Sequence, residues 1–115
     1  MVLLLFCTTA VHAQDNSARE VAEWCRPILG TRQEPGRIRY PATADAGRCV
    51  GTFYTLLTYR FELSGGRVRF CLPDMTTYAL ISIFVQAVDR NPDSRNFDWD
   101  AFINYTFPEL YPCRR

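Results

Sequence analysis

The residues whose type and spacing most clearly predict chemistry in this sequence are four widely spaced cysteines: Cys25, Cys49, Cys71 and Cys113. Four thiols can bind zinc, but every interval here exceeds twenty residues and no C-x-x-C pair is present. The other use is two disulfide bonds, for which four cysteines allow three pairings. Sequence does not select one outright, and we favour sequential pairing, Cys25 with Cys49 and Cys71 with Cys113. Each bond would stabilise the fold by about 3 to 4 kcal/mol by restricting the unfolded chain.

The charged residues argue against most kinds of catalysis. All thirteen basic residues are arginines, and His12 is the only histidine. If residues 1–13 are removed on export, the mature chain has neither lysine nor histidine, which excludes histidine-based acid–base catalysis, Schiff-base chemistry and histidine-ligated metals. One acidic cluster, Asp93, Asp98 and Asp100, could serve a carboxylate-dependent enzyme, but acids are common at helix starts. We therefore expect no enzymatic activity, no cofactor and no metal site.

The first residues predict export. An apolar run at residues 2–6 is followed by small residues and by Val11, His12 and Ala13, which form an acceptable signal-peptidase site. A buried N-terminal strand is the alternative, because the run is short and no positive charge precedes it. Removal of residues 1–13 would also remove Cys7 and leave an even number of cysteines, which is consistent with two disulfides in an exported protein. No other segment is apolar over the roughly 20 residues of a membrane span, so we expect a periplasmic product without one.

One domain is expected across residues 14–115, because about a hundred residues with 48% apolar content can bury a single core. A net charge of +1 without a basic stripe argues against nucleic-acid binding. Four segments of this domain have helical periodicity. We therefore predict an all-α fold, a small disulfide-stapled bundle of about four helices.

Two helices are predicted in the first half of the chain. Ser17 can cap the first, which should stop at Pro27 or by Gly30. The second is predicted from Gly47 to about residue 63, with Asp45 as its cap. A strand is the alternative for this segment, since aromatic and β-branched residues also alternate there. Seventeen residues without a turn signal are long for a strand, however, so we favour the helix.

Two more helices are predicted in the second half. Asp74 or Thr76 can cap the third, and Asn91, which precedes a proline, should end it. Its apolar residues cover most of the circumference, so this helix should be central. They are Leu80, Ile81, Phe84, Val85, Ala87 and Val88. The fourth helix should start near Asp98 and end or kink at Pro108. Its inward-facing residues are predicted to be Trp99, Phe102 and Ile103, with Phe107 as a further candidate.

Four short motifs follow one another over residues 49–113: Cys49-Val50-Gly51, Cys71-Leu72-Pro73-Asp74-Met75-Thr76, Asn91-Pro92-Asp93 and Pro112-Cys113. Their order and spacing resemble those of the type VI secretion amidase immunity proteins, the Tai-like immunity family. The resemblance implies a periplasmic, mostly helical and often dimeric protein that binds and blocks a peptidoglycan amidase injected by a neighbouring cell. A structural or stress-related periplasmic protein of the same fold is the alternative.

An inhibitor of this kind needs a rigid body and a projecting loop, and two loops are candidates. We favour residues 89–96, between the last two helices, where both signs of charge suit a polar catalytic cleft. The charged residues of this loop are Asp89, Arg90, Asp93 and Arg95. A merely solvated helix connection is the alternative. The second candidate is residues 64–70, where Arg67 and Arg69 could reach an acidic partner.

Overall fold

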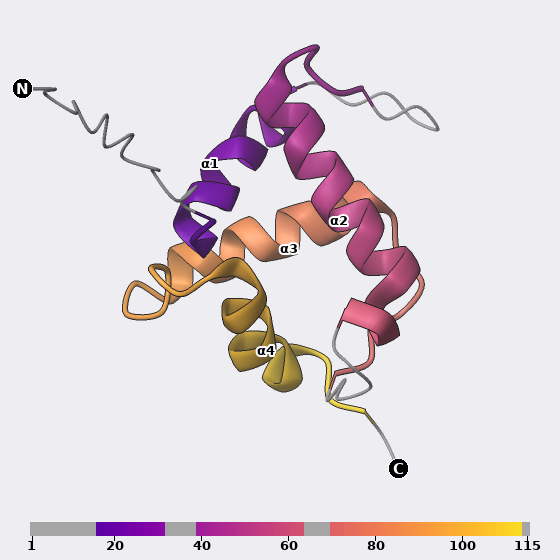
Figure 1. Cartoon of the computed structure of the whole chain (residues 1–115), viewed down its shortest axis with the longest axis vertical. Coiled ribbons are helices and arrows are strands. Elements are labelled where there is room, and N and C mark those ends of the chain that lie inside the picture. Colours follow the sequence, from indigo (N-terminus) through magenta and orange to yellow (C-terminus); the bar gives the residue numbers. More distant parts are fainter. Residues whose placement is uncertain (1–15, 32–38, 64–69, 114–115) are drawn as a thin grey trace, which may run out of the picture.

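The computed structural model describes residues 16–31, 39–63 and 70–113, without the side chains of residues 59–63. The described residues form four helices and no strand: α1 (Ala18–Leu29), α2 (Ala44–Leu63), α3 (Thr77–Arg90) and α4 (Trp99–Leu110). Figure 1 shows α3 in the middle, between α1 above it and α4 below it, with α2 running past one end of α3. The predicted all-α fold is confirmed, and the strand alternative for α2 is wrong. None of the described helices is long and apolar enough to span a membrane.

Side-chain hydroxyls cap α1 and α3. The Ser17 Oγ accepts a hydrogen bond from the Glu20 amide at 3.2 Å, and the Thr76 Oγ1 accepts one from the Ala79 amide at 3.1 Å. These bonds satisfy first-turn amides that have no partner within the helix. The predicted cap of α1 is confirmed, and of the two residues predicted for α3, Thr76 rather than Asp74 is the cap.

The start of α2 differs from the prediction. The helix begins at Ala44 instead of Gly47, and the Thr43 Oγ1 accepts a hydrogen bond from the amide three residues later at 3.2 Å. The prediction that Asp45 caps this helix is wrong. The capping hydroxyl belongs to Thr43, two residues before Asp45, and it accepts the bond from the first-turn amide of Ala46. Asp45 lies inside the first turn and pairs with Arg48 at 3.4 Å. A negative charge there still favours the helix through its dipole.

Neither helical proline ends its helix. α1 continues two residues beyond Pro27, up to the predicted stop at Gly30, and α4 continues two residues beyond Pro108. Both prolines fall in a last turn, so only two helical residues follow each missing amide. Backbone bonding of this type continues after Pro108, since the Tyr111 amide donates to the Phe107 carbonyl at 2.8 Å. The sequence predicts that α4 ends or kinks at Pro108. The first of these predictions is wrong, because the helix continues to Leu110.

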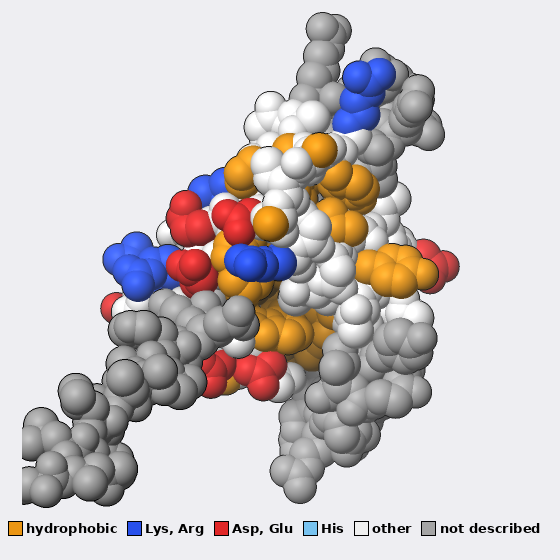
Figure 2. Space-filling model, turned by 45° about the horizontal axis from the view of Figure 1, so that its top comes forward, with side chains coloured by type: hydrophobic (Ala, Val, Ile, Leu, Met, Phe, Trp, Pro, Cys, Tyr) orange, Lys and Arg blue, Asp and Glu red, His pale blue; other side chains and the backbone are white. Residues whose placement is uncertain are grey.

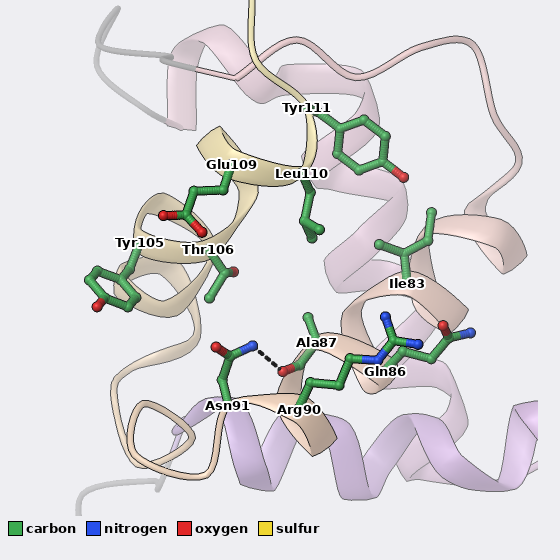
Figure 3. Close-up of a pocket in the computed structure, with 10 residues that line it drawn as sticks. All are labelled: Ile83, Gln86, Ala87, Arg90, Asn91, Tyr105, Thr106, Glu109, Leu110 and Tyr111. Carbon is green, nitrogen blue, oxygen red and sulfur yellow. Dashed lines mark hydrogen bonds between the residues drawn. The ribbon is translucent and has the colours of Figure 1, made fainter.

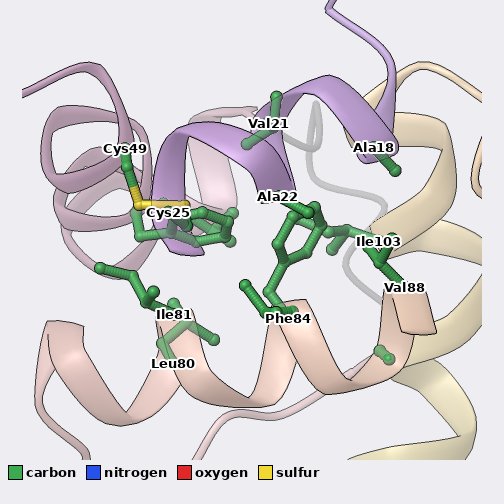
Figure 4. Packing of buried hydrophobic residues seen from close by; sticks show 14 of the residues in the cluster. Ala18, Val21, Ala22, Cys25, Cys49, Leu80, Ile81, Phe84, Val88 and Ile103 are labelled. Carbon is green, nitrogen blue, oxygen red and sulfur yellow. A yellow bond between two sulfur atoms is a disulfide. The ribbon is translucent and has the colours of Figure 1, made fainter. Parts of the chain in front are cut away.

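The core is centred on α3, as the sequence predicts. All six apolar residues from which a central helix is predicted are buried. The ring centroid of Phe84 lies 4.8 Å from that of Phe53 on α2 and 5.6 Å from that of Phe102 on α4. Figure 4 shows Ala22 of α1 close to the same ring. One fully buried phenylalanine thus connects the central helix to residues of the other three.

Two disulfides join the cysteines in the pairing that the sequence analysis favours, Cys25 with Cys49 and Cys71 with Cys113. The first joins α1 to α2 inside the core, where both cysteines are fully buried. The second joins the segment before α3 to the segment after α4, and both of its cysteines are exposed. Since all four thiols are paired, none is left for zinc. Persistent disulfides are typical of oxidising compartments, so these bonds indicate a location outside the cytoplasm.

Candidate partner-binding site

The loop between α3 and α4 spans residues 91–98 instead of the predicted 89–96, because α3 continues through Asp89 and Arg90. This loop is anchored to the first turn of α1. The Ala18 amide donates to the Phe97 carbonyl at 2.8 Å, and the Arg19 amide donates to the Arg95 carbonyl at 2.9 Å. Figure 1 shows this loop beside the start of α1. The first amides of a helix lack intrahelical partners, and here the loop carbonyls satisfy two of them. Hydrogen bonds from α1 therefore fix the backbone path of the loop.

Hydrogen bonds within the loop fix it further. The Asn91 side-chain amide donates to the Ala87 carbonyl at 2.7 Å, which ties the loop to the last turn of α3. The Asn91 carbonyl accepts from the Ser94 and Arg95 amides at 3.1 and 3.2 Å. Ser94 is buried under the turn, and its carbonyl accepts from the Phe97 amide at 3.0 Å. With these bonds in place, the loop would lose little conformational entropy on binding a partner.

Two of the four charged residues predicted for partner binding project from this loop. Asp93 and Arg95 are both exposed, and their side chains form no hydrogen bond or ion pair with another described residue. Arg90, the last residue of α3, is exposed as well. A rigid loop with opposite charges near its tip is suited to a polar cleft of complementary charge.

Asp89, the remaining residue of this set, is paired within the molecule. Its carboxylate accepts two hydrogen bonds from Arg26 on α1, at 2.8 Å from Nη2 and 3.3 Å from Nη1. The same guanidinium contacts Glu23 through Nε at 2.9 Å. Hydrogen bonding to Arg26 lowers the pKa of Asp89, and the two carboxylates raise the pKa of Arg26. The pair joins α1 to α3 beside the loop, so Asp89 holds together the two helices that carry the loop and its anchor.

The second predicted loop lies largely outside the described residues. Arg67 and Arg69 belong to residues 64–69, whose structure is not described. Phe70, which follows, is buried and forms an isolated antiparallel bridge with Pro112.

A groove of about 340 Å³ between α3 and α4 adjoins the anchored loop. Figure 3 shows Leu110 of α4 projecting into it toward α3, whose Ile83 and Ala87 line the facing side. Arg90 and Asn91 line its end nearest the loop, so the groove and the loop form one continuous surface.

Sequence reasoning does not predict this groove. Tyr105 lines it and is 65% exposed, and Leu110 is 49% exposed. The only signal for Tyr105 is that it lies off the inward stripe of α4. Leu110 falls on that stripe, between the directions of Ile103 and Thr106, so periodicity predicts burial. Its exposure follows from the space between the helices, which periodicity does not encode.

The carboxylates considered for catalysis are not enclosed. Asp93, Asp98 and Asp100 are all exposed, and none lines the groove. Asp98 is the N-cap residue of α4 but makes no side-chain cap bond, and Asp100 lies in the first turn. Within the described ranges, no three histidine, cysteine or acidic residues are grouped so as to hold a metal ion.

The surface mixes both signs of charge. Figure 2 shows acidic and basic side chains side by side, next to hydrophobic ones, instead of a patch of one sign on the face in view. The fold and these surfaces together define a small, disulfide-linked, all-α protein with a rigid loop and an adjoining groove. Comparison of the chain with protein-family models, curated proteins and solved structures found no match.

Proposed function

We propose that this protein is an exported immunity protein that binds and inhibits a peptidoglycan amidase delivered by the type VI secretion system, and so protects the producing cell. It would act from the periplasm without catalysing a reaction. The nature of the partner comes from the motifs that resemble Tai-like immunity proteins. The suitability for inhibition comes from the loop at residues 91–98.

The observation that carries the proposal is the anchoring of that loop. Its carbonyls at Arg95 and Phe97 accept hydrogen bonds from α1, and Ser94 is buried beneath its turn. A protein inhibitor must present a fixed shape to a catalytic cleft, because ordering a mobile loop on binding costs about 0.5 to 1.5 kcal/mol per immobilised side chain. This loop is already ordered, and Asp93 and Arg95 remain exposed at its surface.

The disulfides support the same proposal. The Cys71–Cys113 bond closes the segment that contains α3, the loop and α4, and its ends are the motifs on which the resemblance depends. The Cys25–Cys49 bond fixes α1, to which the loop is anchored, against α2. Both bonds agree with an oxidising compartment such as the periplasm. The signal-peptide prediction concerns residues 1–13, which lie outside the described residues.

Binding to the amidase encoded beside this gene tests the proposal. Purified residues 14–115 should form a stable complex with that enzyme and abolish its hydrolysis of peptidoglycan at equimolar concentration. A peptidoglycan hydrolase that cleaves glycosidic bonds is the control and should be unaffected. Absence of an adjacent amidase gene, or no binding to its product, would contradict the proposal and favour the structural or stress-related alternative.

A further inference from the structure

We propose that the groove between α3 and α4 is a second contact surface for the partner and receives one of its segments. That segment would carry an apolar side chain flanked by a carboxylate on one side and a basic group on the other. The inference rests on the proposed function and adds to it a surface outside the loop, together with the chemistry that this surface recognises.

The groove has the dimensions and lining of a site for a side chain. Its volume of about 340 Å³ lies near the lower end of the roughly 300 to 1,000 Å³ of typical ligand pockets. Ile83, Ala87 and Leu110 form an apolar centre, and the Tyr111 ring lies at one end. Leu110 is 49% exposed, so a partner side chain placed beside it would remove apolar surface from water.

The charges on the two walls are opposite and separate. Arg90 belongs to α3 and Glu109 to α4, and neither forms an ion pair or side-chain hydrogen bond with another described residue. Arg26, in contrast, contacts two carboxylates. A cation on one wall and an anion on the other complement a partner segment with the reverse order of charges. This polarity distinguishes the proposed occupant from a purely apolar ligand.

Exposed aromatic residues extend the surface from the groove toward the loop. Tyr105 is 65% exposed and meets Phe97, which is 44% exposed, edge to face at 6.0 Å between centroids. Tyrosine and arginine are enriched among the residues that dominate binding energy in protein interfaces. Since Asn91 belongs to both the loop and the groove wall, a partner seated on the loop would meet the groove directly.

Paired variants test the groove against the rest of the surface. Binding to the adjacent-gene amidase is measured by calorimetry for Tyr105→Ala and Leu110→Ala, with Tyr54→Ala on α2 as the matched control. Tyr54 is 61% exposed, similar to Tyr105, and does not line the groove. We expect each groove variant to weaken binding about tenfold or more and the control to change it by less than about twofold.

Exchanging the charges of the two groove walls tests whether binding depends on their order. The double variant Arg90→Glu/Glu109→Arg leaves the net charge unchanged, so altered long-range attraction would not explain a loss of affinity. The matched control is Asp45→Arg/Arg48→Asp, an exchanged pair on α2. We expect the groove exchange to weaken binding about tenfold or more and the α2 exchange to have little effect. Melting temperatures of all variants confirm that the fold is kept.

Each outcome decides between the proposals. If the wild type binds and the groove variants bind equally well, the groove proposal is overturned while the proposed function stands. If the wild type binds no amidase, both are overturned. Sedimentation of the same variants identifies the remaining occupant: if Tyr105→Ala and Leu110→Ala abolish self-association without changing amidase binding, the groove holds a second copy of this chain and the proposal is wrong.

Discussion

Two arginines on adjacent helices show how tertiary contacts decide the role of a charged residue. Arg26 is held by two carboxylates and joins α1 to α3, whereas Arg90 has no partner among the described residues and faces the groove. Asp89 and Asp93 differ in the same way. Asp89 is bonded to Arg26, whereas Asp93 is exposed and has no side-chain partner in the described part of the chain. Residue type alone therefore does not separate supporting charges from those available to a partner.

The first prediction concerns the exposed charges of the loop. Replacing Asp93 and Arg95 together with alanine leaves the net charge unchanged and should weaken amidase binding, because both side chains are exposed on the loop that we propose contacts the partner. Since neither has a side-chain partner within the described structure, the free energy of unfolding should change by less than about 0.5 kcal/mol. Calorimetric titration and urea unfolding measure the two effects.

The matched control for the loop variant is the Asp45→Ala/Arg48→Ala pair on α2, which removes the same two charges far along the chain. This control should bind as the wild type does. Equal affinity for the loop variant and the wild type would show that another surface makes the contact.

The second prediction concerns pH. Because Arg26 lowers the folded-state pKa of Asp89, their pairing stabilises the fold above the unfolded aspartate pKa of about 3.9, and this stabilisation is lost as the pH falls through the lower folded value. The Asp89 side chain is 54% exposed, so the pair contributes at most about 1 kcal/mol. Asp89→Asn should therefore lower the free energy of unfolding slightly at neutral pH, and the difference from the wild type should shrink below about pH 4. Urea unfolding at several pH values measures this; a difference independent of pH would contradict it.

At the scale of the element, each helix combines local signals with a tertiary constraint. Hydroxyl caps begin α1, α2 and α3, while the start of α4 is held by the Trp99 amide donating to the Asn16 carbonyl at 3.0 Å. α2 has two glycines, Gly47 and Gly51, where an added Cβ would meet no atom within 4 Å. Neither glycine is required by a close approach of another described helix.

The third prediction follows from the open space at Gly51. Alanine there should raise the free energy of unfolding by about 0.5 to 1 kcal/mol, because glycine loses more backbone entropy in a helix interior and alanine is the better helix former. Urea unfolding of Gly51→Ala measures the change. A lower stability would mean that this position contacts something that the described residues do not include.

At the scale of the whole molecule, one core and two bonds hold the four helices together. α3 supplies the centre of the core. The two disulfides each join segments that are distant in sequence, one inside the core and the other at the surface. Cys25–Cys49 is fully buried, whereas Cys71–Cys113 is at the surface. The loop and the groove both lie within the segment closed by the surface bond.

The fourth prediction concerns the centre of the core. Phe84→Ala should lower the free energy of unfolding by about 3 to 5 kcal/mol, because the ring is fully buried against Phe53 and Phe102 and its loss leaves a cavity. Exposed Phe97 provides the comparison, and Phe97→Ala should cost far less. Similar losses for both would show that Phe84 is not central.

The fifth prediction separates the two disulfides. A dithiol reductant under native conditions should reduce Cys71–Cys113 before Cys25–Cys49, because thiolate attack requires access to a sulfur atom. Alkylation of the released thiols followed by mass spectrometry identifies the order. Simultaneous labelling of all four cysteines would indicate that reduction proceeds through global unfolding instead.

Much of the fold could be predicted because its signals are local. The caps at Ser17 and Thr76, the Gly30 stop and the six buried positions of α3 depend on residues within one or two turns of each other. The misplaced start of α2 is a local error as well, since Thr43 and Asp45 are both acceptable caps and only the folded backbone selects one. For the proposed site, the sequence predicted a loop at residues 89–96, and Asp93 and Arg95 are exposed in the loop that the structure shows at 91–98, whereas Asp89 and Arg90 belong to α3.

The sequence by itself determined which helices form and which of their faces are apolar; tertiary structure alone decided what covers those faces. Arg26 and Asp89 pair across 63 positions of the chain, which no local pattern encodes. Leu110 continues the inward stripe of α4, yet it remains half exposed because a groove separates it from α3. Periodicity gives the direction of a side chain around its own helix, whereas burial depends on how closely another helix approaches, and that distance is set by the packing of the entire core.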